Sequence, residues 1–153
     1  MDTETVLRAR ALLGENTPLV FDCGKVCGAA CCLPDEDGQG GMYLFPGEEA
    51  LLPGESDGFA PVYVCNGRCG RESRPLACRL FPLTPVKRKT GWEVRIDRRA
   101  RAMCPLARFG TRGLNPAFVR AAREAVRLIA ADPQGEAFLL GWARIERRYA
   151  LRL

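Results

Sequence analysis

Eight cysteines are the residues of this 153-residue chain whose type and spacing point most directly to chemistry. Four are clustered as Cys-x3-Cys-x3-Cys-Cys, two form Cys-x3-Cys, and two stand alone. In chain order they are Cys23, Cys27, Cys31, Cys32, Cys65, Cys69, Cys78 and Cys104. Thiolate is the ligand that soft and borderline metals prefer, and tetrahedral four-sulfur sites belong to zinc or iron–sulfur chemistry. We therefore predict that these eight cysteines bind metal, as zinc or as an iron–sulfur cluster.

Other residue types narrow this chemistry. The chain contains no histidine, which excludes mixed Cys/His zinc sites and histidine-based catalysis. Hard cations such as Mg²⁺ and Ca²⁺ prefer oxygen and have no need of these thiols. The sequence has no phosphate-binding loop, hydrolase or dinucleotide signature.

The spacing leaves the local structure and the grouping of the ligands open. On a helix, Cys-x3-Cys places both sulfurs on one face. The glycines next to these cysteines favour tight loops equally well. Neighbouring side chains point in different directions, so the Cys31-Cys32 pair could supply two sites, bridge two metals, or leave one thiol for redox work.

The compartment predicted from the sequence keeps these thiols reduced. The acidic, polar start of the chain does not resemble a secretory signal, and no apolar run is long enough to span a bilayer. We expect a cytoplasmic protein without a membrane partner. In that compartment eight cysteines do not indicate four disulfides.

The formal net charge of +5 is consistent with thiolate ligands. Eight thiolates holding two zinc ions would reduce it to +1, and one four-cysteine [4Fe–4S]²⁺ site would reduce it to +3. Seven arginines could form a basic surface: Arg98, Arg99, Arg101, Arg144, Arg147, Arg148 and Arg152. No nucleic-acid-binding motif accompanies them, so we do not expect nucleic acid as the partner. A protein partner is left open.

Short elements are predicted around the cysteines. Residues 3–13 form an amphipathic helix with Val6, Ala9 and Leu13 on one face, ended by Gly14. Residues 42–45 and 59–65 are extended, and residues 46–49 open a helical turn. Residues 83–86 and 92–97 form a hairpin, because apolar and charged residues alternate from Trp92 to Asp97.

The last third of the chain is predicted to be helical. Asn115-Pro116 and Asp132-Pro133 are helix starts, each with a capping residue followed by proline. The first helix carries a stripe of Val119, Ala122, Val126 and Ile129, and the second carries Phe138, Trp142, Ile145 and Tyr149. Both stripes have the spacing of core residues.

Together these elements predict an α+β fold in a single domain over residues 1–153. An irregular cysteine-rich metal-binding lobe, with short strands and a β-hairpin, occupies about residues 21–105. A helical part covers about residues 115–150. The N-terminal and C-terminal helices cap the lobe.

Several of these motifs occur in the order found in one known family. The clustered cysteines ending in Cys31-Cys32, the Cys65/Cys69 pair, Arg-Pro-x-x-Cys-Arg-x-Phe-Pro over residues 74–82, and a last cysteine at Cys104 resemble the YkgJ-type family. That family is described as zinc- or iron-chelating CxxCxxCC proteins. The resemblance covers about residues 21–105, and the first two gaps contain three residues here rather than two. It implies metal bound by the eight cysteines but no particular reaction.

Two functions follow from the resemblance and the residues. The first is a metal-binding module, for which removal of the metal unfolds residues 21–105 while the C-terminal helices partly persist. The alternative is an iron–sulfur redox protein or enzyme, by analogy with the cysteine module of flagellin lysine-N-methylases. A thiol oxidoreductase is a third hypothesis, although the usual Cys-x-x-Cys is missing.

Residues near the cysteines have predicted supporting roles. Arg74 and Arg79 flank Cys78 and either stabilise thiolate charge or form ordinary surface ion pairs. Phe81-Pro82 packs as a hydrophobic plug over the metal region. The three nearest candidate acid/base groups are expected to face solvent: Asp22, Glu48 and Glu49.

Overall fold

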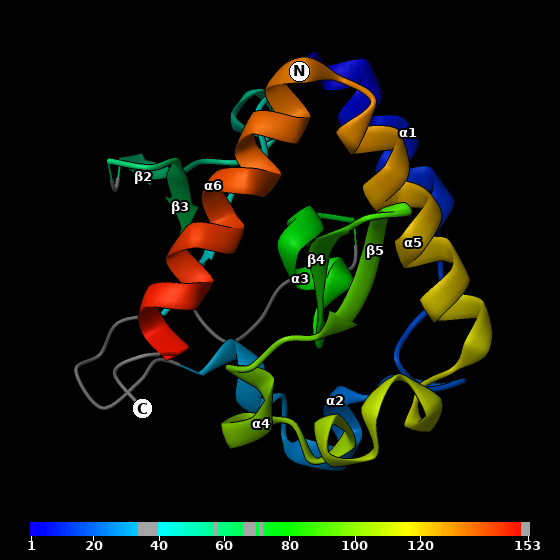
Figure 1. Ribbon diagram of the computed structural model, residues 1–153. Helices are drawn as coiled ribbons and strands as arrows, with labels where there is room; N and C mark the ends of the chain where they lie inside the picture. The colour runs from blue at the N-terminus through cyan, green and yellow to red at the C-terminus, as the bar shows by residue number, and fades with distance from the viewer. Residues whose placement is uncertain (34–39, 57, 66–69, 71, 151–153) are drawn as a thin grey trace.

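The computed structural model describes residues 1–33, 40–56, 58–65, 70 and 72–150 (Figure 1). Within these ranges it is a mixed α+β fold, as the sequence predicts. Most helices and strands are short and lie between an N-terminal helix and two long C-terminal helices. Cys69 and Arg152, which carried sequence predictions, lie outside the described residues.

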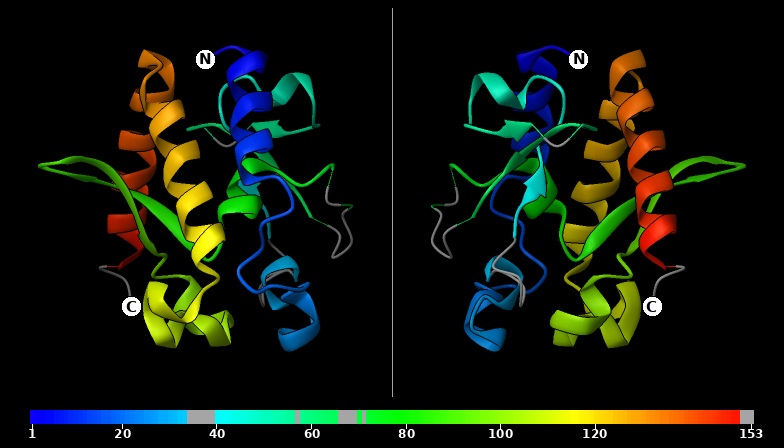
Figure 2. Two further views of the ribbon diagram at one scale, coloured as in Figure 1. Left: turned by 90° about the vertical axis from the view of Figure 1, so that its right-hand side faces the viewer. Right: turned by 90° about the vertical axis from the view of Figure 1, so that its left-hand side faces the viewer.

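The first helix, α1 (Thr3–Leu13), matches its prediction residue for residue. Asp2 caps it by accepting a hydrogen bond from the Thr5 N–H at 2.8 Å, and Gly14 ends it. Val6, Ala9 and Leu13 are buried because their three- and four-residue spacing puts them on one face. That face packs against α5, and Figure 2 shows the two helices side by side.

A small antiparallel sheet follows, with strand order β1-β3-β2. Its strands are β1 (Met42–Tyr43), β2 (Glu55–Ser56) and β3 (Pro61–Tyr63). The predicted extended segments 42–45 and 59–65 contain β1 and β3 but are longer than the strands, and β2 had no prediction. A 3₁₀ turn, η2 (Glu48–Ala50), forms where a helical turn was expected.

The central hairpin joins β4 (Leu83–Arg88) to β5 (Gly91–Ile96). Leu83 pairs with Ile96, and Arg88 pairs with Gly91. The first strand is therefore longer than predicted, the second begins one residue earlier, and the turn is shorter than the predicted five-residue connection, since the strand pairing continues through Lys87 and Arg88.

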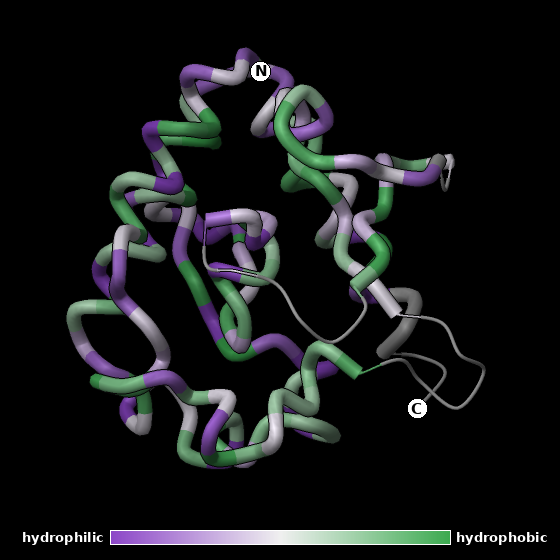
Figure 3. The backbone as a smooth tube through the Cα atoms, turned by 180° about the vertical axis from the view of Figure 1, so that it is seen from behind, coloured by the Kyte–Doolittle hydropathy of each residue, from purple (hydrophilic) through white to green (hydrophobic). Residues whose placement is uncertain are grey.

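The C-terminal helices are α5 (Pro116–Ala130) and α6 (Pro133–Ala150), and they begin at the two predicted Asx-Pro starts. Asn115 accepts a hydrogen bond from the Ala117 N–H at 3.0 Å, and Asp132 accepts one from the Gln134 N–H at 2.9 Å. Hydrophobic residues (green) and hydrophilic residues (purple) both recur along the long helices in Figure 3.

Most of the two predicted stripes is buried. Ala122, Val126 and Ile129 are fully enclosed on α5, and Phe138 and Trp142 are buried on α6, whereas Val119 and Ile145 are only partly buried. The side chain of Tyr149 lies outside the described set. Helix α5 contacts β5 and α6 contacts β4, so the helical pair packs on the hairpin.

The hydrophobic core brings together α1, α5, α6, the hairpin, and α3 (Leu76–Leu80). Among the described residues, none from 14–41 or 97–113 belongs to the buried core cluster, although the partly buried Leu106 packs against it. These two segments form α2 (Gly24–Cys27), η1 (Ala30–Cys32), α4 (Ala100–Met103) and the 3₁₀ turns of η3 (Pro105–Gly113). They lie together at the end of the molecule opposite the N-terminus (Figures 1 and 2). No described helix combines the length and the apolar character needed to cross a membrane.

Candidate metal centre

The described cysteines belong to five short segments. Cys23 immediately precedes α2 and Cys27 is its last residue. The other positions are η1 for Cys31 and Cys32, two residues after β3 for Cys65, α3 for Cys78, and the residue after α4 for Cys104. All seven are free thiols, so none forms a disulfide in this part of the chain.

The first cysteine pair is held by one turn of helix. Cys23 and Cys27 are four residues apart on α2, and the Cys27 sulfur donates a long hydrogen bond of 3.8 Å to the Cys23 carbonyl. The Asp22 carboxylate accepts the Gly24 N–H at 3.0 Å and so fixes the start of this turn. Both structures that the cysteine spacing allowed, a helical turn and a tight loop, are therefore present, because the helical turn is followed at once by a tight reversal of the chain.

That reversal delivers the adjacent cysteines. Gly28 has φ +61° and Ala29 has φ +56°, so two consecutive residues are left-handed. This conformation costs an alanine about 1–2 kcal/mol, and such strain is often found at functional sites. The Cys32 N–H then bonds the Ala29 carbonyl at 2.7 Å, which closes η1.

Cys32 is in contact with two other thiols. Its sulfur accepts hydrogen bonds from Cys31, its chain neighbour, and from Cys65, which follows β3. The Cys32–Cys65 contact links two groups of the sequence motif that are more than thirty positions apart in the numbering.

A single cavity collects most of the cysteines. Its volume is about 590 Å³. Six cysteines from α2, η1, α3 and α4 line it: Cys23, Cys27, Cys31, Cys32, Cys78 and Cys104. Phe81, Pro82 and Met103 supply apolar walls, so Phe81-Pro82 lies beside these cysteines.

The charged residues of the cavity are mainly basic. Lys25, Arg74 and Arg79 line it together with one carboxylate, Asp22, for a net charge of +2. Four thiolates with one Zn²⁺ carry −2, as do four thiolates around a [4Fe–4S]²⁺ core. The +2 charge of the cavity wall would therefore balance the −2 charge of a four-cysteine centre. Lys25 had no sequence prediction, because only the fold turns it toward the cysteines.

The surroundings shift the pKa values of three of the thiols in different directions. Hydrogen bonding to the neighbouring Cys32 is the main cause that raises the pKa of Cys31. The pKa of Cys32 is lowered to about 6, first by the Cys31 hydrogen bond and then by the Arg74 charge and Cys65. Burial raises the pKa of Cys23, as do the nearby Cys27, Asp22 and Cys104, while Arg74 opposes that rise. The proximity of Arg74 to two thiols favours its predicted role in thiolate support over a surface ion pair.

The side chains do not form a finished coordination sphere. In the described part of the chain, no three cysteine or acidic side chains lie close enough to one another to hold an ion. The thiols line the same cavity, so coordination requires their side chains to rotate toward a common centre.

The nearby carboxylates differ in their environments. Asp22 lines the cavity and is exposed, and Glu49 is exposed with one hydrogen bond to the Gly47 N–H at 2.7 Å. Glu48 contradicts the expectation that it faces solvent, since it is completely buried. Its carboxylate can be buried because backbone N–H groups and Arg10 surround it.

No family model matches the chain, and neither a curated protein nor a solved structure matches it.

Proposed function

We propose that this protein binds a thiophilic metal, as zinc or as an iron–sulfur centre, through the cysteines of the cavity. The observation that carries the proposal is that six cysteines from four separate elements line one cavity. Scattered structural thiols would be buried individually in the core, yet no cysteine belongs to the described core cluster.

The residues of the cavity suit such a centre chemically. The six lining cysteines are the nearest candidate ligands, with Cys65 beside Cys32. Cys69 completes the set implied by the resemblance to YkgJ-type proteins. When bound, zinc would supply a redox-inert cross-link, whereas an iron–sulfur cluster would supply an electron-transfer couple. The net +2 charge of the other lining residues balances either form.

The test is element analysis combined with optical and paramagnetic spectroscopy on protein purified without oxygen. An iron–sulfur centre gives broad absorbance near roughly 400 nm that bleaches on reduction, and zinc gives a colourless protein with stoichiometric metal. Cys23→Ser and Cys104→Ser should each lower the metal content. Val26→Ala, a non-thiol change in the same cavity, should leave it unchanged. Wild-type protein without metal, or metal content unaffected by both cysteine variants, would refute the proposal.

Thiol–disulfide chemistry is a second candidate, favoured by the two hydrogen bonds that Cys32 accepts from thiols. It requires a free sulfur when the metal is bound. Mass-spectrometric mapping after brief alkylation of the metal-loaded protein decides between the two functions. Labelling of Cys32 in that form supports exchange chemistry, and its protection supports coordination.

A further inference from the structure

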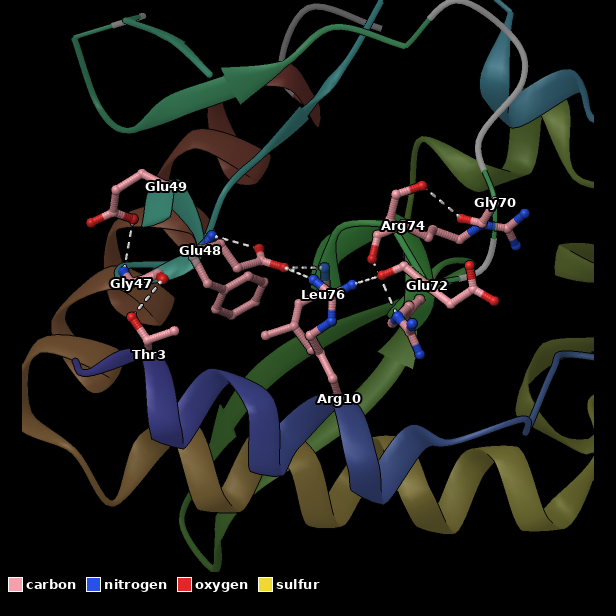
Figure 4. Close-up of polar contacts among 12 residues, drawn as sticks. Thr3, Arg10, Gly47, Glu48, Glu49, Gly70, Glu72, Arg74 and Leu76 are labelled. Carbon is pink, nitrogen blue, oxygen red and sulfur yellow. Dashed lines mark hydrogen bonds and ion pairs between the residues drawn. The ribbon is translucent and has the colours of Figure 1, made fainter. Parts of the chain in front are cut away.

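Glu48 is a buried charge with no part in the cavity itself. Its side chain is completely enclosed between η2, α1 and the start of α3. One oxygen accepts the Leu76 N–H at 2.8 Å and the other accepts the Phe45 N–H at 3.0 Å. The Arg10 guanidinium lies 3.5 Å from the first oxygen. Figure 4 shows this carboxylate between the helices.

The Leu76 contact caps the helix that carries Cys78. Leu76 is the first residue of α3, and Pro75 before it provides no side-chain cap. The first N–H groups of a helix have no partner inside it, and a five-residue helix is too short to be stable alone. Glu48 supplies the missing acceptor from 28 residues away.

The same pair also holds the approach to α3. Besides its ion pair with Glu48, Arg10 donates a hydrogen bond to the Glu72 carbonyl, four residues ahead of Leu76. At the other side, the Arg79 Nε donates to the Arg74 carbonyl at 3.2 Å, which closes the segment on itself. Leu76, Ala77 and Leu80 face the core, which leaves Cys78 and Arg79 toward the cavity.

We infer that Glu48 and Arg10 form a positioning pair that holds Cys78 and Arg79 at the metal cavity. The inference rests on the proposed function in taking Cys78 as a metal ligand. It adds two residues from outside the cysteine motif to the centre. Both act through α3 and neither contacts the metal.

The test compares Glu48→Gln with Glu49→Gln. A glutamine at position 48 can accept only one of the two backbone N–H groups, and its amide N–H₂ then faces the other donor. Glu49 is the matched control, because it is the next carboxylate along the chain but is exposed. Cobalt substitution reports the number of bound thiolates through the intensity of its sulfur-to-metal charge-transfer band.

In Glu48→Gln we expect that intensity to fall by about a quarter, as one of four thiolates is lost, with metal affinity reduced about 10–100-fold. Glu49→Gln should behave as wild type. Adding Glu48→Gln to Cys78→Ser should cause no further loss, since both changes act on the same ligand. Equal behaviour of Glu48→Gln and Glu49→Gln, or full additivity with Cys78→Ser, would overturn the inference.

A readout without metal separates this inference from the proposed function. In metal-free protein, the alkylation rate of Cys78 relative to Cys23 should rise in Glu48→Gln and stay at the wild-type ratio in Glu49→Gln. If the wild type binds no metal, the proposed function fails and this ratio still decides the positioning role. Arg10→Lys keeps a positive charge for the buried Glu48 but cannot make both guanidinium contacts, to Glu48 and to the Glu72 carbonyl, so it serves if Glu48→Gln does not fold. A changed ratio in Arg10→Lys supports the inference, and an unchanged one contradicts it.

Discussion

At the scale of single residues, Cys32 is a thiol whose neighbours favour the ionised form. With a pKa of about 6, it is largely thiolate at neutral pH, whereas the pKa of Cys23 is raised by burial. Thiolate is the reactive species toward alkylating agents. In metal-free, oxygen-free protein we therefore expect iodoacetamide to label Cys32 before Cys23, with a rate that rises through a midpoint near pH 6.

The neutral variant Arg74→Gln tests whether the Arg74 charge lowers the pKa of Cys32. Removing this cation should move the midpoint of the Cys32 rate to higher pH, because the Arg74 charge is one of the groups that lower its pKa. Peptide mapping across a pH series measures both quantities. Labelling of Cys23 ahead of Cys32 would contradict the proposed electrostatics.

The cysteines of the cavity could be singled out from the sequence, but their neighbours could not. Thiol density and the missing histidine point to sulfur ligands from composition alone. By contrast, the Cys32–Cys65 contact, the place of Lys25 in the cavity wall and the burial of Glu48 all depend on tertiary structure. The expectation that Glu48 faces solvent failed because two of its partners, the Leu76 N–H and the Arg10 guanidinium, come from segments that the sequence does not link.

At the scale of elements, a partly buried ion pair joins the last helix to the hairpin. Glu146 of α6 is 3% exposed and lies 2.7 Å from Arg95 of β5. Its other oxygen is buried without a hydrogen bond. Burial and the nearby Asp97 raise the pKa of Glu146 above its ordinary 4.5, although Arg95 and Arg99 oppose this.

This raised pKa has a definite consequence for stability. Between pH 4.5 and the higher folded-state pKa, the native protein binds more protons at Glu146 than the unfolded chain does. The contribution of this residue to the free energy of unfolding is therefore full below pH 4.5 and declines as the pH rises through that window. We expect the difference between wild type and Glu146→Gln, measured by urea denaturation, to fall with rising pH there. A difference that is constant or grows with pH would contradict the assignment. Glu136, partly exposed on the same helix, is the control position, since hydrogen bonds from Lys87 and Trp92 lower its pKa.

Elements with many periodic residues were predictable, and those with few were not. The helices α1, α5 and α6 and the hairpin carry caps, prolines or alternation over many positions, and all form where expected. The sheet β1-β3-β2 has strands of two or three residues, too short to show a period. Its pairing joins segments about twenty residues apart, which local patterns do not specify.

At the scale of the whole molecule, the cysteine-rich region is divided between the core and its edge. From the sequence, residues 21–105 are predicted to form one lobe that unfolds without metal. In the structure, α3 and the hairpin, which lie in that range, pack into the same core cluster as α1, α5 and α6. The segments 14–41 and 97–113 add no described buried side chain to that cluster, although the partly buried Leu106 packs against it, and they carry five of the cavity cysteines.

This division predicts a local response to loss of metal. Metal-binding energy is folding energy where a segment lacks a core of its own. We therefore expect chelation to remove hydrogen-exchange protection from α2, η1 and α4, while α1, β4, β5 and α5 keep theirs. Helix α3 should respond in between, because its core face and the Glu48 cap remain when Cys78 is released. Hydrogen exchange is measured by mass spectrometry on metal-loaded and chelated protein. If residues 21–105 were a single lobe, β4 and β5 would lose protection together with α2. Exchange at α2, η1 and α4 that stays unchanged in protein shown to have lost its metal would contradict the prediction. These turns would then be held by their own hydrogen bonds, and the metal would not organise this end of the molecule.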